Sequence, residues 1–265
     1  MRILVLLACM LVSPAVAHEL WIEPKDYQLR TADNIVAHIK NGENFEGIQL
    51  TYLPTDFAHF VILGANQGAV VTSRLGDRPA VDQAAPASGL NVIVYETEPR
   101  TISYDSFEKF EAFAMNHGVG DIAAKHSARG LSSGPLEEVY TRYSKALVSV
   151  GAARGDDRRI GLEAELVALD NPYLPNDARH VRVQLFLQGA PLPNSQVELY
   201  AKGSLGEVKA STHRTDADGV AMLPIEPGFD YMANAVIFRP PHERHRGTDA
   251  VWATLWANLT FAVPD

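Results

Sequence analysis

His18 is the residue whose position alone suggests a specific chemistry. Residues 1–17 have the pattern of a secretory signal peptide, with Arg2 at the start, an apolar run over residues 3–12 and Ala15-Val16-Ala17 at the end. Cleavage after Ala17 would make His18 the first residue of the processed chain. Its α-amine and its imidazole Nδ1 could then chelate one metal ion, because an α-amine has an ordinary pKa near ~7.7–8.0 and releases its proton readily to a metal.

One further imidazole would complete a set of three nitrogens, which suits Cu(II) or Ni(II). Three histidines are candidates for this ligand. His242 and His245 lie three residues apart in a polar segment that we expect to be a loop, and His38 lies in an apolar segment near the N-terminus. Each also has a structural interpretation, as a solvated loop histidine (His242, His245) or a hydrogen-bonded strand histidine (His38). The sequence therefore predicts a metal site formed by His18 with His242, His245 or His38.

No other motif in the chain predicts a site. The segment Thr215–Gly219 carries two aspartates before a glycine, but a calcium loop that began at Asp216 would need an acidic twelfth residue, and that position is Pro227. A hairpin turn explains the segment. Residues 130–134 have the spacing Gly-x-Ser-x-Gly, but we expect them to form a loop without the strand-turn-helix context of a nucleophile elbow. No glycine-rich phosphate loop follows a strand. We therefore predict no catalytic residues and no enzymatic activity.

Composition limits the possible partners. Lys and Arg number 23 against 32 Asp and Glu, for a formal net charge of −9, and this balance argues against nucleic acid as a partner. No apolar run approaches the ~20 residues that a transmembrane helix needs, so we expect no transmembrane segment. The single cysteine, Cys9, lies in the predicted signal peptide. A secreted chain without disulfides fits the periplasm of a Gram-negative bacterium.

Short segments of strand-like residues separated by Gly, Asn and Asp predict a mainly β protein. The predicted strands are Asn34–Lys40, Ile48–Leu53, Phe57–Leu63, Ala69–Arg74, Leu90–Thr97, Leu162–Leu169, His180–Leu187, Gln196–Lys202, Val208–Thr215, Val220–Pro224, Tyr231–Arg239 and Leu255–Val263. Two helices are predicted between the two groups of strands, at Ser106–Asn116 and at Leu136–Leu147, and Gly151–Arg159 is predicted to be a linker or a solvated loop.

This pattern predicts two β-sandwich units with a helical insert between them. The boundaries that we expect are 18–104 for an N-terminal sandwich, 105–151 for the insert and 152–265 for a C-terminal sandwich. The C-terminal unit resembles the immunoglobulin-like modules of carboxypeptidase regulatory regions and surface proteins.

Several segments together resemble one protein family. They are Ala17–Pro24, Tyr140–Gly151, Asp170–Tyr173, Thr215–Gly219 and Trp252–Phe261. Their order is similar to that of the periplasmic family known as domain of unknown function 4198, whose members are often labelled periplasmic components of cobalt or nickel uptake. The resemblance implies a periplasmic location and a role in metal transport, and it adds Co(II) to the ions that His18 could bind.

Three functions follow as hypotheses. The first is a periplasmic accessory protein that binds a transition-metal ion through His18 and supports metal uptake or delivery. The second is a β-sandwich interaction protein whose partner is an outer-membrane receptor or a transporter. The third is a copper oxygenase, because an N-terminal histidine with a second imidazole resembles the histidine brace of lytic polysaccharide monooxygenases. Such an enzyme would also need a flat aromatic face, for which Trp21, Trp252 and Trp256 are the available tryptophans.

Overall fold

The computed structural model describes residues 18–174, 179–242, 245 and 247–264, so the predicted signal peptide lies outside the described residues. The described chain is mainly β, as predicted, with three sheets and two α-helices. None of these helices is long and apolar enough to cross a membrane.

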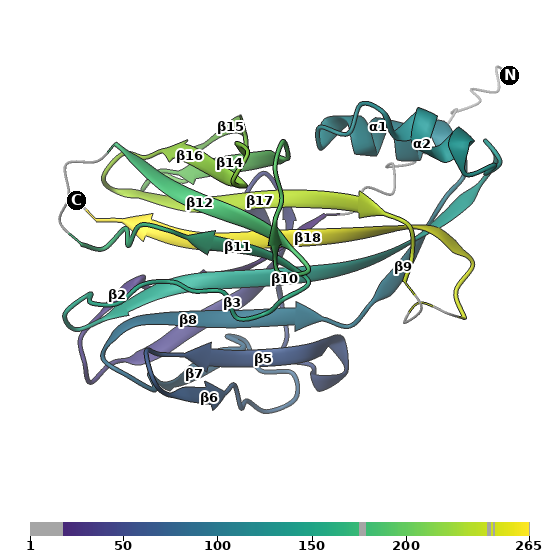
Figure 1. The fold of residues 1–265 in the computed structure, drawn as a ribbon. Helices are drawn as coiled ribbons and strands as arrows, with labels where there is room; N and C mark the ends of the chain where they lie inside the picture. The colour runs from purple at the N-terminus through teal and green to yellow at the C-terminus, as the bar shows by residue number, and fades with distance from the viewer. Residues whose placement is uncertain (1–17, 175–178, 243–244, 246, 265) are drawn as a thin grey trace, which may run out of the picture.

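The elements follow one another in the order shown in Figure 1. They are β1 (Glu19–Pro24), β2 (Gln28–Leu29), β3 (Asn34–Glu43), β4 (Glu46–Leu50), a 3-10 turn (Pro54–Asp56), β5 (Phe57–Leu63), β6 (Gly68–Val70), β7 (Val81–Ala84), β8 (Gly89–Thr97), β9 (Arg100–Tyr104), α1 (Phe107–Asn116), α2 (Ile122–Ala128), β10 (Leu136–Val150), β11 (Ala164–Ala168), β12 (His180–Leu187), β13 (Ala190–Pro191), β14 (Gln196–Lys202), β15 (Val208–Arg214), β16 (Val220–Pro224), β17 (Phe229–Arg239) and β18 (Ala250–Val263).

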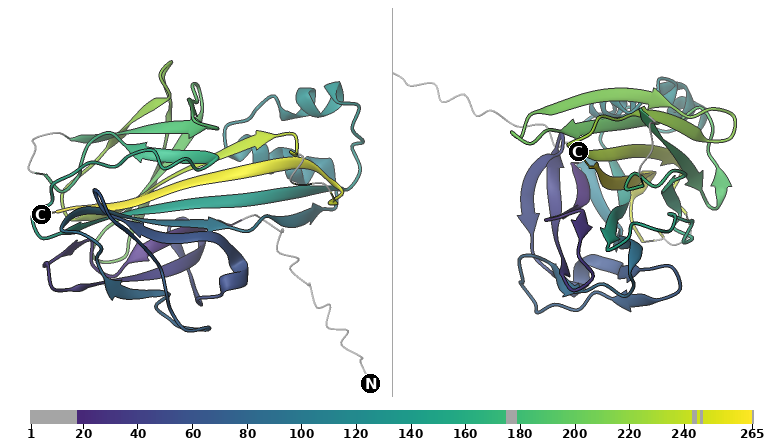
Figure 2. Two further views of the ribbon diagram at one scale, coloured as in Figure 1. Left: turned by 60° about the horizontal axis from the view of Figure 1, so that its bottom comes forward. Right: turned by 90° about the vertical axis from the view of Figure 1, so that its left-hand side faces the viewer.

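A ten-stranded central sheet forms the middle of the molecule. Its main path runs β15-β14-β17-β18-β10-β8-β5-β6, with β2 and β9 paired to β10. The long strands β10 and β18 pair in parallel and lie side by side in Figure 2. The central sheet therefore hydrogen-bonds strands from both predicted sandwich units, and it also includes β10 from the predicted insert.

The predicted helix at Leu136–Leu147 is wrong, because these residues belong to β10. This strand is rich in β-branched and aromatic residues such as Val139, Thr141 and Tyr143, which favour a strand. It is buried on both faces, and a strand covered on both sides shows no alternation of apolar and polar residues. The helix predicted at Ser106–Asn116 is confirmed as α1, with Ser106 at its N-cap.

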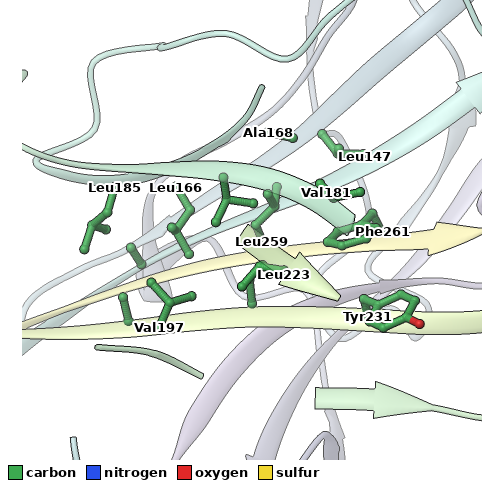
Figure 3. Close-up of a cluster of buried hydrophobic side chains, with 14 of the residues drawn as sticks. Leu147, Leu166, Ala168, Val181, Leu185, Val197, Leu223, Tyr231, Leu259 and Phe261 are labelled. Carbon is green, nitrogen blue, oxygen red and sulfur yellow. The ribbon is translucent and has the colours of Figure 1, made fainter. Parts of the chain in front are cut away.

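Two smaller sheets cover the faces of the central sheet. The C-terminal sheet (β11, β12, β13 and β16) packs on one face around a large apolar cluster, part of which Figure 3 shows. The N-terminal sheet (β1, β3, β4 and β7) packs around a second apolar cluster, and α1 and α2 cover a third one. Along β10, Leu147 belongs to the cluster under the C-terminal sheet and Val148 to the cluster under the N-terminal sheet, as the alternation of a strand requires.

Strand β1, which the sequence did not predict, joins the N-terminal sheet to the central sheet. Its backbone pairs with β3. The carbonyl group of His18, just before β1, and alternate carbonyl groups in β1 accept hydrogen bonds from side chains of the central sheet. The bonds run from Arg142 to the His18 carbonyl, from Ser144 to the Leu20 carbonyl at 2.7 Å and from Thr260 to the Ile22 carbonyl at 2.7 Å. The position of His18 is therefore set by two sheets at once.

Candidate functional site

His18 immediately precedes β1, and its backbone is held firmly. The Arg142 guanidinium donates two hydrogen bonds to the His18 carbonyl oxygen, from Nε at 3.1 Å and from Nη2 at 2.8 Å. The His18 side chain is 48% exposed. The residue is thus fixed through its main chain while its imidazole stays accessible to solvent.

Glu43 is the carboxylate beside the His18 imidazole. The two side chains approach to 3.4 Å between Nε2 of His18 and Oε1 of Glu43. A carboxylate at this nitrogen favours the tautomer that carries its proton on Nε2, so the lone pair lies on Nδ1. Nδ1 is the imidazole nitrogen that a chelate with the α-amine would use.

The hairpin that carries Glu43 has an unusual turn. Asn44 and Phe45 join β3 to β4 with φ angles of 53° and 62°, the left-handed region that type I′ turns require. This conformation is uncommon for a bulky residue, but Phe45 is 1% exposed and packs edge-on against Trp21 at 5.5 Å between ring centroids. The Lys202 ammonium lies 4.1 Å from the Phe45 ring centroid. These contacts stabilise the turn and, with it, the position of Glu43.

The structure does not bring His38 to His18. His38 is opposite Glu23 in the pairing of β1 with β3, five residues along the strand from His18, which is a separation of roughly 16 Å. Its Nδ1 is buried and has no hydrogen-bond partner in the described part of the chain. Burial lowers the pKa of His38, and the charge of Lys40 lowers it further.

His242 and His245 lie on the other face of the central sheet. Nε2 of His242 is 3.5 Å from Oε1 of Glu163, and Glu163 accepts a hydrogen bond from the Tyr143 hydroxyl at 3.3 Å. Tyr143 faces the C-terminal sheet, whereas its neighbour Arg142 holds His18 on the opposite face. His245 is 5% exposed, and its Nδ1 accepts a hydrogen bond from the backbone of His242 at 3.2 Å. The two loop histidines thus lie together but away from His18.

Sequence reasoning missed a buried polar network beside β1. Glu198 accepts hydrogen bonds from His117 at 2.7 Å and from Asn234 at 2.9 Å. Burial raises the pKa of Glu198, but the hydrogen bonds and the charge of His117 outweigh that effect and lower it overall. The Tyr200 hydroxyl donates to Glu19 at 3.0 Å, and burial raises the pKa of Glu19. Carboxylates within short strand segments resemble a solvated face in the sequence, so no local signal indicated this network.

The described residues contain no group of three or more His, Cys, Asp or Glu side chains arranged to hold a metal ion. A chelate at His18 would use only one such side chain, together with the backbone amine that cleavage would release. With that amine, His18 would offer two nitrogens to a transition-metal ion, and the Glu43 carboxylate lies beside its ring.

The chain matches one family model and is similar to several solved structures. The model of a domain of unknown function, DUF4198, matches residues 15–238. A crystal structure of a tetra-tandem repeat in the extending region of a large adhesion protein is similar with 13% identity and a TM-score of 0.21. That alignment covers 92% of this chain and 49% of the other, so this chain spans about half the length of the structure that it matches. No curated protein matches the chain.

Proposed function

Because the chain belongs to the DUF4198 family, to which no function is assigned, we propose a function from its own residues: a periplasmic accessory protein that binds a transition-metal ion. The ion, Cu(II), Ni(II) or Co(II), binds to the α-amine and the imidazole Nδ1 of His18 in the processed chain. The protein then supports uptake or delivery of that ion through a partner such as a transporter or an outer-membrane receptor.

The double hydrogen bond from Arg142 to the His18 carbonyl is the observation that carries this proposal. A flexible terminus must be ordered when it binds a metal, and this ordering reduces the affinity. Here the backbone of His18 is already fixed, and Glu43 supports the imidazole tautomer that leaves Nδ1 free.

The separation of the other histidines supports delivery rather than storage. His38 lies five residues away along β1, and His242 and His245 lie on the opposite face of the central sheet. The chelate thus supplies two protein nitrogens and leaves other coordination positions to water or to a ligand. Open positions allow a second protein to take over the ion by ligand exchange.

A titration of the processed protein with each metal tests the proposal. The protein is exported, kept untagged and checked by mass spectrometry for an N-terminal His18. We expect one equivalent of Cu(II) or Ni(II) to bind, with nitrogen couplings in the electron paramagnetic resonance spectrum of the copper form. His18→Ala, or one extra residue before His18, weakens binding at least ~100-fold, since each removes one arm of the chelate.

His59→Ala is the matched control for this titration. His59 is also an exposed histidine beside a carboxylate, with Nδ1 2.8 Å from Oε2 of Glu96. The control variant keeps the wild-type affinity. Equal affinity of wild type, His18→Ala and the extended chain would remove His18 from consideration.

A second variant tests the role of Glu43. Glu43→Gln keeps the size of the side chain but removes the negative charge beside the His18 ring. We expect the metal affinity to fall by ~10-fold, as for other carboxylates that support a histidine ligand. Glu96→Gln, next to His59, is the control. An unchanged affinity in Glu43→Gln would mean that this carboxylate does not support the ligand.

The positions of the tryptophans favour binding over oxygenase chemistry. Trp21 is 0% exposed, and Trp252 and Trp256 are each 2% exposed. They therefore cannot form the flat aromatic face with which a polysaccharide oxygenase would hold its substrate.

A further inference from the structure

A cavity of about 380 Å³ opens beside His18. Its volume lies within the range of small-molecule sites. The cavity is lined by residues from the 3-10 turn and from six strands, β1, β3, β4, β8, β9 and β10. It therefore lies where the N-terminal sheet meets the central sheet.

Arg142 places a buried positive charge in the wall of this cavity. The residue is 8% exposed, and no carboxylate of the described residues lies within ion-pair distance of its guanidinium, although the charge of Glu138 acts on it from further away. Two of its nitrogens donate to the His18 carbonyl, and its plane packs 4.4 Å from the ring centroid of Tyr140. A buried charge without an ion pair is costly, because the carbonyl and the ring only partly replace the lost hydration. An anion in the cavity would offset this cost.

Three more groups in the wall can donate hydrogen bonds to such an anion. Tyr95 is 2% exposed, and its hydroxyl has no hydrogen-bond partner among the described residues. The Thr97 hydroxyl accepts a bond from the Arg142 amide at 3.0 Å, which leaves its own proton free to donate. Arg100 is paired with Asp56 through Nη2 at 2.7 Å and is 51% exposed, so its guanidinium keeps other donors at the rim.

Part of the remaining wall is apolar, and the rest is formed by His18, Asn41, Tyr140 and Asp56, whose carboxylate pairs with Arg100. Leu20, Leu50 and Ile102 line the cavity next to the arginines and the tyrosine. An inorganic anion is hydrated on every side and gains nothing from such a wall, whereas the carbon chain of an organic acid is stabilised by burial against it. The guanidinium of arginine also matches the planar geometry of a carboxylate.

We propose that this cavity is a binding site for a small organic carboxylate, held by Arg142, Tyr95 and Arg100, with its carbon chain against Leu20 and Ile102. The site goes beyond the proposed metal function and does not require a metal ion, because none of its donors is a metal ligand in that function.

Calorimetric titration with succinate in buffer depleted of metal ions tests the site. We expect succinate to bind with one equivalent, and inorganic phosphate and acetate to bind at least ~10-fold more weakly. Tyr95→Phe keeps the ring and its packing on Phe60 but loses the hydroxyl, and we expect affinity to fall ~5-fold. Arg142→Lys keeps the charge but loses the planar fork, and we expect a loss of at least ~10-fold.

Arg100→Gln and Arg182→Gln form a matched pair of variants at the surface. Each arginine pairs with an aspartate, at 2.7 Å for Arg100 and 2.6 Å for Arg182, and the side chains are 51% and 49% exposed. Only Arg100 lines the cavity, so Arg100→Gln weakens succinate ~10-fold and Arg182→Gln leaves its affinity unchanged.

Three results would overturn the assignment. They are no succinate binding at millimolar concentration, tighter binding of phosphate than of succinate, and wild-type affinity in both Tyr95→Phe and Arg100→Gln. If Arg142→Lys does not fold, Tyr95→Phe and Arg100→Gln still show whether succinate binds in this cavity. The succinate titration contains no metal ion, whereas the His18→Ala test measures metal affinity. Each of the two proposals can therefore fail without the other.

Discussion

Replacing Lys145 with methionine lowers the free energy of unfolding by about 3–5 kcal/mol. The Lys145 ammonium lies between Asp157 at 2.8 Å and Glu165 at 3.2 Å, and all three side chains are at most 1% exposed. Removing the cation leaves two carboxylates close together without water or a counter-charge. Urea unfolding monitored by circular dichroism measures the change.

The control for this prediction is an exposed lysine in a similar pair. Lys125 pairs with Asp121 at 3.0 Å, with side chains 53% and 63% exposed, so Lys125→Met leaves the unfolding midpoint nearly unchanged. A triple variant that combines Lys145→Met with Asp157→Asn and Glu165→Gln should recover much of the lost unfolding free energy. The two amides carry no charge but keep their hydrogen-bond acceptors. Equal stability of Lys145→Met and wild type would contradict the buried ion cluster.

Glu138 makes the protein less stable as the pH rises from about 4.5 to 7. The carboxyl is 0% exposed and accepts hydrogen bonds from Tyr104 at 2.8 Å and from Thr254. Burial raises the pKa of Glu138 from 4.5 to about 7, although these hydrogen bonds and the charges of Arg142 and His117 act in the opposite direction. Between these two pH values the folded protein binds more protons than the unfolded chain. Its free energy of unfolding therefore falls across this interval by about 3 kcal/mol.

Glu138→Gln removes this dependence, because the amide stays neutral at every pH. The difference in unfolding free energy between Glu138→Gln and wild type should therefore change by about 3 kcal/mol, in favour of the variant, from pH 4.5 to pH 7.5. Denaturant unfolding at a series of pH values measures it, and Glu137→Gln at the adjacent position is the control. A difference that does not depend on pH would show that folding does not raise the pKa of Glu138.

Much of the fold could be predicted from the sequence where one face of an element is exposed. The three- and four-residue spacing of Phe107, Phe110, Phe113 and Ala114 indicated α1 because the other side of that helix faces solvent. Strand β10 gave no such signal, because sheets cover both of its faces. The predicted linker contains Asp157, whose buried side chain pairs with Lys145 in β10, so long-range pairing overrides the local composition.

The candidate site was predictable only in part, because some of its contacts depend on how the strands pair. His18 stood out because the signal-peptide pattern marks the residue after the cut. Glu43 did not, because it reaches His18 only through the pairing of β1 with β3 and through the turn at Phe45. The same pairing register puts His38 too far along the strand to serve as a ligand, and a sequence without a known register cannot measure that distance.

The side-chain bonds to β1 also constrain the order in which the molecule can form. Thr260 in β18 donates to the Ile22 carbonyl, a contact between residues 238 positions apart. Contacts of such high sequence separation slow folding, because a long segment must close before they are gained. The packing of β1 therefore cannot be completed until the segment that forms β18 is present, more than two hundred residues later in the chain.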